Sequence, residues 1–136
     1  MVNLIYGKKG SGKTKRLIDM TNAELSETKG NVAFIDDDKR YMYDIKPMVR
    51  FVDTTEYAID SSEKLYGLLC GMMAQDYDLS AIYIDAFLKI IGKTPLEAET
   101  VIKSLEAIAE KHNVKIVINM SGDPGEATEY LKGLMI

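Results

Sequence analysis

The apolar and polar positions of this chain follow two periods that alternate along its length. Short runs of consecutive apolar residues predict buried strands at Val2–Tyr6, Asn31–Asp36, Val49–Asp53, Ala81–Asp85 and Val114–Asn119. The first run stops at a glycine and the others end in carboxylate or amide side chains. Polar side chains are therefore expected at the points where the chain leaves the strands.

Between these runs, apolar residues recur every three or four positions, which predicts helices. Such stripes lie at residues 13–29, 62–76, 95–109 and 127–132. Pro95 is expected in the first turn of its helix, with Thr94 as the N-cap. Residues 41–46 fit neither period, so no element is assigned to them.

Strands that alternate with helices are typical of the α/β class. Neighbouring strands then pair in parallel through right-handed crossovers, with helices on both faces of the sheet. The expected architecture is a three-layer α/β/α sandwich around a mainly parallel five-stranded sheet. The 136 residues contain no linker, repeat or low-complexity segment, so a single domain spanning residues 1–136 is predicted.

Charge and composition narrow the possible partners. The net charge of −4 argues against a protein whose main task is binding nucleic acid, because such domains carry a strong basic excess. A single cysteine and a single histidine exclude an internal disulfide and a cysteine-rich zinc site. No apolar run approaches the roughly 20 residues that span a bilayer, and the N-terminus lacks a signal-peptide core. A cytoplasmic protein is expected.

The segment Gly7–Thr14 fits the pattern G-x-x-x-x-G-K-[ST] of the Walker A phosphate loop. It follows a predicted strand and opens a predicted helix, as that motif requires. Its glycines let successive main-chain N–H groups point at phosphate oxygens, and the helix N-terminus adds positive charge. The residues expected to contact a nucleotide are Gly7, Lys8, Lys9, Gly10, Ser11, Gly12, Lys13, Thr14 and Lys15. Among them, Lys13 would reach the β- and γ-phosphates, and the Thr14 hydroxyl would ligate Mg²⁺.

Carboxylates at the ends of two predicted strands complete the candidate chemistry. Asp85 ends its strand at the sheet edge where α/β proteins bind ligands, so it is expected to hold Mg²⁺ together with Thr14. Many P-loop ATPases place a glutamate directly after this aspartate, but here the next residue is Ala86. The run Asp36–Asp38 contains the best substitutes for orienting an attacking water. A solvated acidic loop is the alternative interpretation of that run.

Taken together, the phosphate loop, Val32–Asp38, Ile82–Asp85 and Ile116–Asn119 resemble the RecA-type branch of P-loop ATPases, over roughly residues 2–120. The resemblance implies ATP and Mg²⁺ as ligands and the strand order 1-5-4-2-3. A short final strand at residues 134–136 would then be the only cover for the edge beyond the first strand. An edge left open there would favour a protein partner or a homo-oligomer.

The same resemblance assigns catalytic roles to individual positions. It places the water-activating carboxylate at Asp38, where the family has glutamate, and makes Lys13, Asp38 and Asp85 the catalytic set. The γ-phosphate sensor falls near Met120, whose side chain cannot hydrogen-bond as the family's glutamine does, so Asn119 or Ser121 would substitute. The loops that follow the fourth and fifth strands are too short for the DNA contacts of a recombinase.

Three functions remain open on these residues. The first is a P-loop ATPase that binds ATP and Mg²⁺ and is slow alone or activated by a partner. The second is a nucleotide-binding regulatory or assembly module with little hydrolysis. The third is a small-molecule kinase of the nucleoside type, in which residues 36–40 would hold the acceptor.

Overall fold

The computed structural model of this protein describes all residues from Met1 to Ile136. Its five strands form one sheet in the order β1-β5-β4-β2-β3, and every neighbouring pair is parallel. The strands are β1 (Val2–Gly7), β2 (Asn31–Asp36), β3 (Arg50–Asp53), β4 (Leu79–Ile84) and β5 (Lys115–Ser121). This structure confirms the predicted strand order 1-5-4-2-3 and the predicted parallel pairing of the strands.

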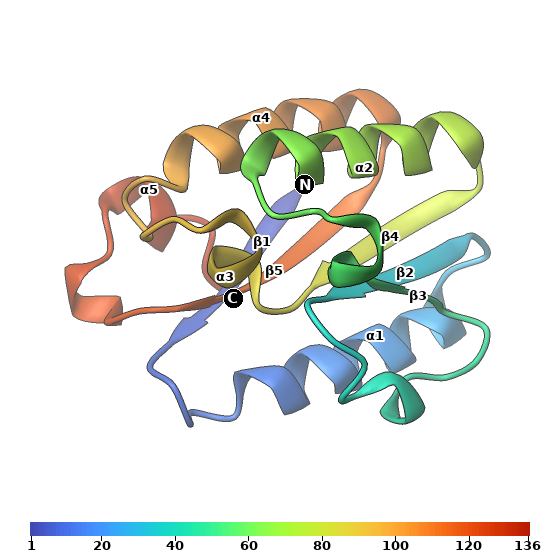
Figure 1. Ribbon diagram of the computed structural model, residues 1–136, viewed down its shortest axis with the longest axis horizontal. Coiled ribbons are helices and arrows are strands. Elements are labelled where there is room, and N and C mark those ends of the chain that lie inside the picture. The colour runs from blue at the N-terminus through green and yellow to red at the C-terminus, as the bar shows by residue number, and fades with distance from the viewer.

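Five α-helices cover the two faces of the sheet, as Figure 1 shows. They are α1 (Lys13–Glu27), α2 (Ser62–Gln75), α3 (Phe87–Ile91), α4 (Glu99–His112) and α5 (Glu129–Lys132). Helix α1 lies on one face, whereas α2 and α4 lie side by side on the other (Figure 1). The result is the expected three-layer sandwich. No helix combines the length and the apolar character that a membrane crossing requires.

The hydrophobic core is divided by the sheet into two parts. The larger part lies beneath α2 and α4 and includes Leu69 and Leu105, and the smaller part lies beneath α1 and includes Leu17. Central strands such as β2 face both parts, so Val32 to Asp36 are all buried. This two-sided burial is why these strands appear in the sequence as continuous apolar runs.

The segment after β4 differs from the prediction. Residues 86–94, read as a loop, contain α3, whose Phe87, Ile90 and Ile91 are buried in the core. These three apolar residues are spaced as on one face of a helix. A helix of only five residues, however, is too short for this periodicity to be recognised in the sequence. Helix α4 begins at Glu99 rather than at the predicted proline. Thr94 caps the turn before it, where its hydroxyl accepts the Glu97 N–H over 3.4 Å and donates to the Glu97 carboxylate over 2.9 Å.

The predicted helix at residues 127–132 is shorter than expected. It consists of α5 alone and follows a 3₁₀ turn at Pro124–Glu126. The chain then runs beside β1, where Leu4 N–H donates to the Leu134 carbonyl over 2.8 Å and Ile136 N–H donates to the Leu4 carbonyl over 3.0 Å. The predicted strand at residues 134–136 is only an isolated parallel bridge between Leu4 and Met135, which covers part of the outer edge of β1. No strand pairs with the outer edge of β3.

Candidate functional site

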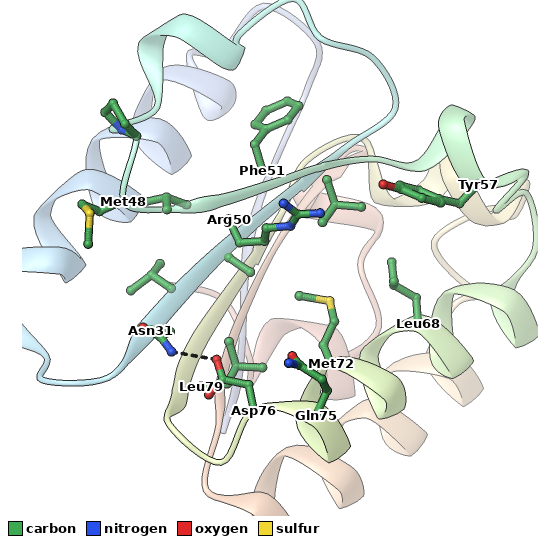
Figure 2. Close-up of a pocket in the computed structure, with 15 residues that line it drawn as sticks. Asn31, Met48, Arg50, Phe51, Tyr57, Leu68, Met72, Gln75, Asp76 and Leu79 are labelled. Atoms are coloured by element: carbon green, nitrogen blue, oxygen red, sulfur yellow. Dashed lines mark hydrogen bonds between the residues drawn. The ribbon is translucent and has the colours of Figure 1, made fainter.

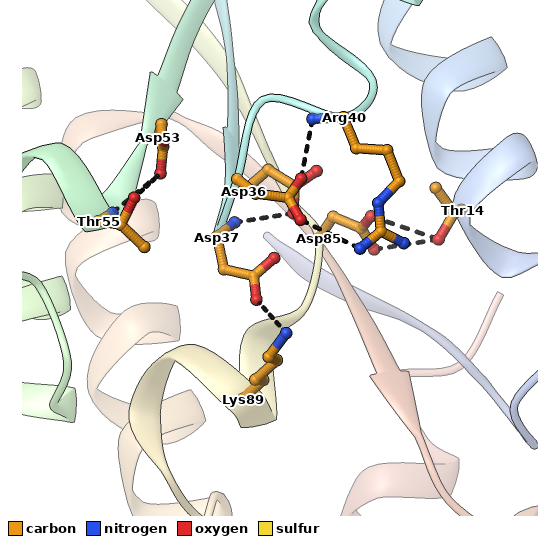
Figure 3. A network of polar contacts seen from close by, with 9 residues as sticks. Thr14, Asp36, Asp37, Arg40, Asp53, Thr55, Asp85 and Lys89 are labelled. Atoms are coloured by element: carbon orange, nitrogen blue, oxygen red, sulfur yellow. Dashed lines mark hydrogen bonds and ion pairs between the residues drawn. The ribbon is translucent and has the colours of Figure 1, made fainter.

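The candidate site lies at the carboxyl ends of the strands, because a parallel sheet brings all these ends to one edge. The glycine-rich loop (residues 7–14) connects β1 to α1 at this edge. Asp36 ends β2, Asp85 follows β4, and Asn119 lies near the end of β5. Figure 3 shows Thr14, Asp36 and Asp85 converging there from three different elements.

The backbone of the glycine-rich loop explains two of its glycines. Gly10 and Gly12 have φ angles of 80° and 82°, in the left-handed region that a side chain disfavours. Apart from Ser11 N–H, which donates to the Lys8 carbonyl, the N–H groups of residues 8–15 donate to no main-chain acceptor. A loop of free N–H groups at the N-terminus of a 15-residue helix is an anion-binding geometry.

The Lys13 side chain is bound to the main chain of this loop. Its ammonium group donates to the Lys8 carbonyl over 2.9 Å. Partial burial lowers the pKa of Lys13, and the charge of Asp85 opposes that effect. The Lys13 ammonium is therefore tethered to an exposed main-chain oxygen, a contact it can exchange for a stronger one with an anion.

Thr14, Asp85 and Asn119 form a polar cluster beside the loop. The Thr14 hydroxyl lies 3.3 and 3.4 Å from the two Asp85 carboxylate oxygens, and Asn119 Nδ2 donates to Asp85 Oδ1 over 2.6 Å. Asp85 and Asn119 are each only 6% exposed. A hydroxyl and a carboxylate are the hard oxygen donors that Mg²⁺ prefers, so these residues fit a magnesium ion.

Asp36 is the most unusual group of the site. Its side chain is 2% exposed, and its Oδ2 has no hydrogen-bond partner. Desolvation, with further contributions from the charges of Asp85 and Asp37, raises the pKa of Asp36 to about 8, despite the N–H that Asp37 donates to it. A protonated carboxyl therefore faces Asp85 in this state of the protein.

The other two carboxylates of the acidic turn are paired with cations. Lys89 of α3 lies 2.8 Å from Asp37, and its hydrogen bond lowers the pKa of Asp37 in spite of the desolvation that raises it. Arg40 lies 3.2 Å from Asp38. Carboxylate oxygens of Asp36, Asp37 and Asp38 come within 4.8 Å of one another. Asp38 is thus restrained by Arg40, and Asp36 is the member of the turn that faces Asp85.

The structure thus brings most of the predicted residues together. Lys9 lines a cavity of about 300 Å³ with Asp85, Asn119 and Lys89. Met120, at the predicted sensor position, is fully buried in the core. Both predicted substitutes, Asn119 and Ser121, line this cavity, and Asn119 also donates to Asp85. Lys15 points away, where it pairs with Asp19 on the exposed surface of α1.

Two members of the site, Asn119 and Lys89, were indicated weakly or not at all by the sequence. Asn119 was only one of two possible sensor substitutes, and its contact with Asp85 depends on β5 pairing with β4. Lys89 had no signal at all, since its partner Asp37 belongs to a different strand end. Asp53, which ends β3, resembles these carboxylates in position but accepts hydrogen bonds from Thr55 and caps the turn after β3.

A wider cavity, of about 750 Å³, lies away from this edge (Figure 2). It is formed where the amino ends of β2 and β4 meet the start of β3 and the last turns of α2, and Asn31 bonds to Asp76 at its floor. Its lining is mostly apolar, with Arg50 projecting across it. The volume of a cavity alone therefore does not identify the candidate site, because the glycine-rich loop and Asp85 do not line this larger cavity.

Comparison with known proteins adds no family assignment. Neither a scan against protein-family models nor a search of curated proteins gave a match to this chain. The functional interpretation consequently depends on the site geometry.

Proposed function

We propose that this protein binds ATP with Mg²⁺ at the glycine-rich loop and hydrolyses ATP, slowly alone or faster with a partner. It would be a minimal, single-domain member of the RecA-like branch of P-loop ATPases. The observation that carries the proposal is the meeting of Lys13, Thr14 and Asp85 at the start of α1, with Thr14 3.3 Å from the Asp85 carboxylate. The strand order 1-5-4-2-3, with β5 between β1 and β4, also supports it.

Each group has a distinct role in this proposal. The free N–H groups of the loop and the N-terminus of α1 would bind the phosphate oxygens. Lys13 would leave the Lys8 carbonyl for the terminal phosphates. Thr14 and Asp85 would hold Mg²⁺, which when bound neutralises charge on those phosphates.

Slow hydrolysis is expected because neither candidate base is free in this state. Asp38 is paired with Arg40, and Asp36, with a pKa raised to about 8 by burial, is mostly protonated at neutral pH. A partner or a second copy that rearranged the acidic turn would release one of them. The outer edge of β3, which has no pairing strand, is one place where such a partner could bind.

A nucleotide-binding regulatory or assembly module is the second candidate. It is favoured by Ala86 directly after Asp85 and by the fully buried Met120 at the sensor position. Such a module would bind nucleotide through the same loop but would turn it over at a negligible rate. The two candidates therefore share a binding site and differ only in hydrolysis.

The binding step is tested by thermal unfolding with ATP, ADP or GTP plus Mg²⁺. ATP at 100 times its dissociation constant stabilises the folded state by about 2.7 kcal/mol, which raises Tm by roughly 5–10 °C for a chain of this length. Lys13→Ala should abolish the shift. Lys111→Ala, which removes an exposed lysine at the end of α4, should retain it. An unchanged shift in Lys13→Ala would refute the site.

The hydrolysis step is tested by multiple-turnover release of phosphate. Turnover above that of Lys13→Ala supports the ATPase, and turnover equal to that variant supports the regulatory module. Asp85→Asn should weaken the dependence of ATP binding on Mg²⁺ because it removes an anionic ligand. The same binding curve measured with EDTA provides the control.

A further inference from the structure

Residues of the glycine-rich loop line two separate cavities. The cavity of about 300 Å³ contains Asp85, Asn119 and Lys9. The other, of about 430 Å³, contains the loop residues Lys8, Ser11 and Lys13 together with Tyr6, Arg16 and Pro124. A single elongated ligand lying across the loop would reach both.

The chemistry of the first cavity sets the direction of such a ligand. If Thr14 and Asp85 hold Mg²⁺ as in the proposed function, on which this inference rests, the terminal phosphates would lie at the Asp85 end, where the ion would neutralise their charge. The rest of the nucleotide must then extend away from Asp85. The cavity beside Tyr6, Arg16 and Pro124 contains residues of the loop but neither Asp85 nor Asn119, so it is the cavity that can receive this part.

Arg16 is suited to contact a nucleobase there. It lies in the first turn of α1, and its Nη1 donates to the main-chain oxygen of Ile136 over 2.9 Å, which orients the guanidinium group. Arg16 pairs with no Asp or Glu side chain, and no such side chain lines this cavity. A planar guanidinium that is held at one end and has no acidic side chain as a partner can stack on an aromatic ring.

Tyr6 and Pro124 form the other walls of this cavity. The Tyr6 ring lies directly over Gly122, where a Cβ atom would come within 2.5 Å of the tyrosine hydroxyl. Glycine at this position therefore lets the chain after β5 approach Tyr6 and bring Pro124 to the cavity. Tyr6 and Pro124 are compact, rigid surfaces that lose little conformational entropy when they contact a ring.

We propose that the cavity formed by Tyr6, Arg16 and Pro124 binds the nucleoside half of the nucleotide, with the Arg16 guanidinium stacked on the base. Arg16 thereby distinguishes a nucleoside triphosphate from an inorganic polyphosphate chain. The loop alone would bind both through their phosphates.

The test compares ATP with inorganic tripolyphosphate, each with Mg²⁺, by isothermal titration calorimetry. The proteins are the wild type, Arg16→Ala, Arg16→Lys and Lys13→Ala, with Arg50→Ala as an arginine control at the far cavity. We expect Arg16→Ala to bind ATP about tenfold more weakly, as befits the loss of a single base-stacking contact, and tripolyphosphate as tightly as the wild type. Arg16→Lys should also lose most of the preference, because it keeps the charge but not the plane.

The outcomes separate this inference from the proposed function. If the wild type binds neither ligand, the proposed function is wrong and the inference falls with it. If Lys13→Ala weakens both ligands while Arg16→Ala binds ATP like the wild type, the inference alone is wrong. Equal weakening of both ligands in Arg16→Ala would make Arg16 a phosphate ligand and also overturn it. Arg16 is exposed, so circular dichroism should show an unchanged fold in its variants.

Discussion

Replacing Asp36 with asparagine should stabilise the protein, and increasingly so as the pH rises. Asp36 is buried beside Asp85, and burial raises its pKa from 3.8 to about 8. Between these two pH values the folded state binds a proton that the unfolded state has lost, so the free energy of unfolding falls as pH rises. The loss begins near pH 4 and levels off above pH 8. Asparagine resembles the protonated carboxyl and removes this dependence.

The magnitude follows from the pKa difference. Each pKa unit corresponds to about 1.36 kcal/mol, so full expression of the shift from 3.8 to about 8 would cost several kcal/mol at pH 8. Relaxation around a buried charge reduces such values in real proteins. We therefore expect Asp36→Asn to exceed the wild type by about 2–4 kcal/mol at pH 8 and to match it near pH 4.

Urea unfolding followed by circular dichroism at pH 5, 6, 7 and 8 measures this difference directly. Asp38→Asn is the matched control, because Asp38 is partly exposed and already paired with Arg40, so its variant should not gain stability with pH. Parallel stability curves for Asp36→Asn and the wild type would refute the reasoning. They would mean that Asp36 is ionised and well solvated in the folded protein.

Two further substitutions test the packing that supports the site. Tyr83→Phe removes the 2.7 Å hydrogen bond to Glu24, where hydrogen bonds from Tyr83 and Lys115 outweigh desolvation and lower the carboxyl pKa. It should cost about 1.5–3 kcal/mol in urea unfolding at pH 7. This loss of unfolding free energy should shrink as the pH falls through the lowered pKa of Glu24. An undiminished loss at pH 3 would contradict this account. Gly30→Ala would place a Cβ atom 2.4 Å from the Asp78 carbonyl oxygen. This clash should lower the free energy of unfolding by more than about 2 kcal/mol. Gly67→Ala, whose Cβ meets nothing within 4 Å, should be neutral or up to about 1 kcal/mol stabilising, and equal effects of the two alanines would refute the clash.

Local signals in the sequence accounted for most of the fold. The apolar runs predicted all five strands, because a parallel sheet that is covered by helices on both faces buries the two faces of its strands. The strand order came from the resemblance, not from periodicity, and the observed pairing agrees with it. The helix at Phe87–Ile91 was missed because five residues contain too few turns for a periodic signal.

Most residues of the candidate site were also predictable from the sequence, whereas most of the contacts between them were not. The sequence by itself determined the glycine-rich loop, since Gly10 and Gly12 meet a local backbone requirement. It also determined the carboxylate that ends β2 and the one directly after β4. Only the tertiary structure decided which of these groups meet. The Asn119–Asp85 and Lys89–Asp37 contacts, and the burial that raises the Asp36 pKa, join residues from different strand ends. Pairing and desolvation of this kind depend on distances across the fold, and a one-dimensional pattern does not contain them.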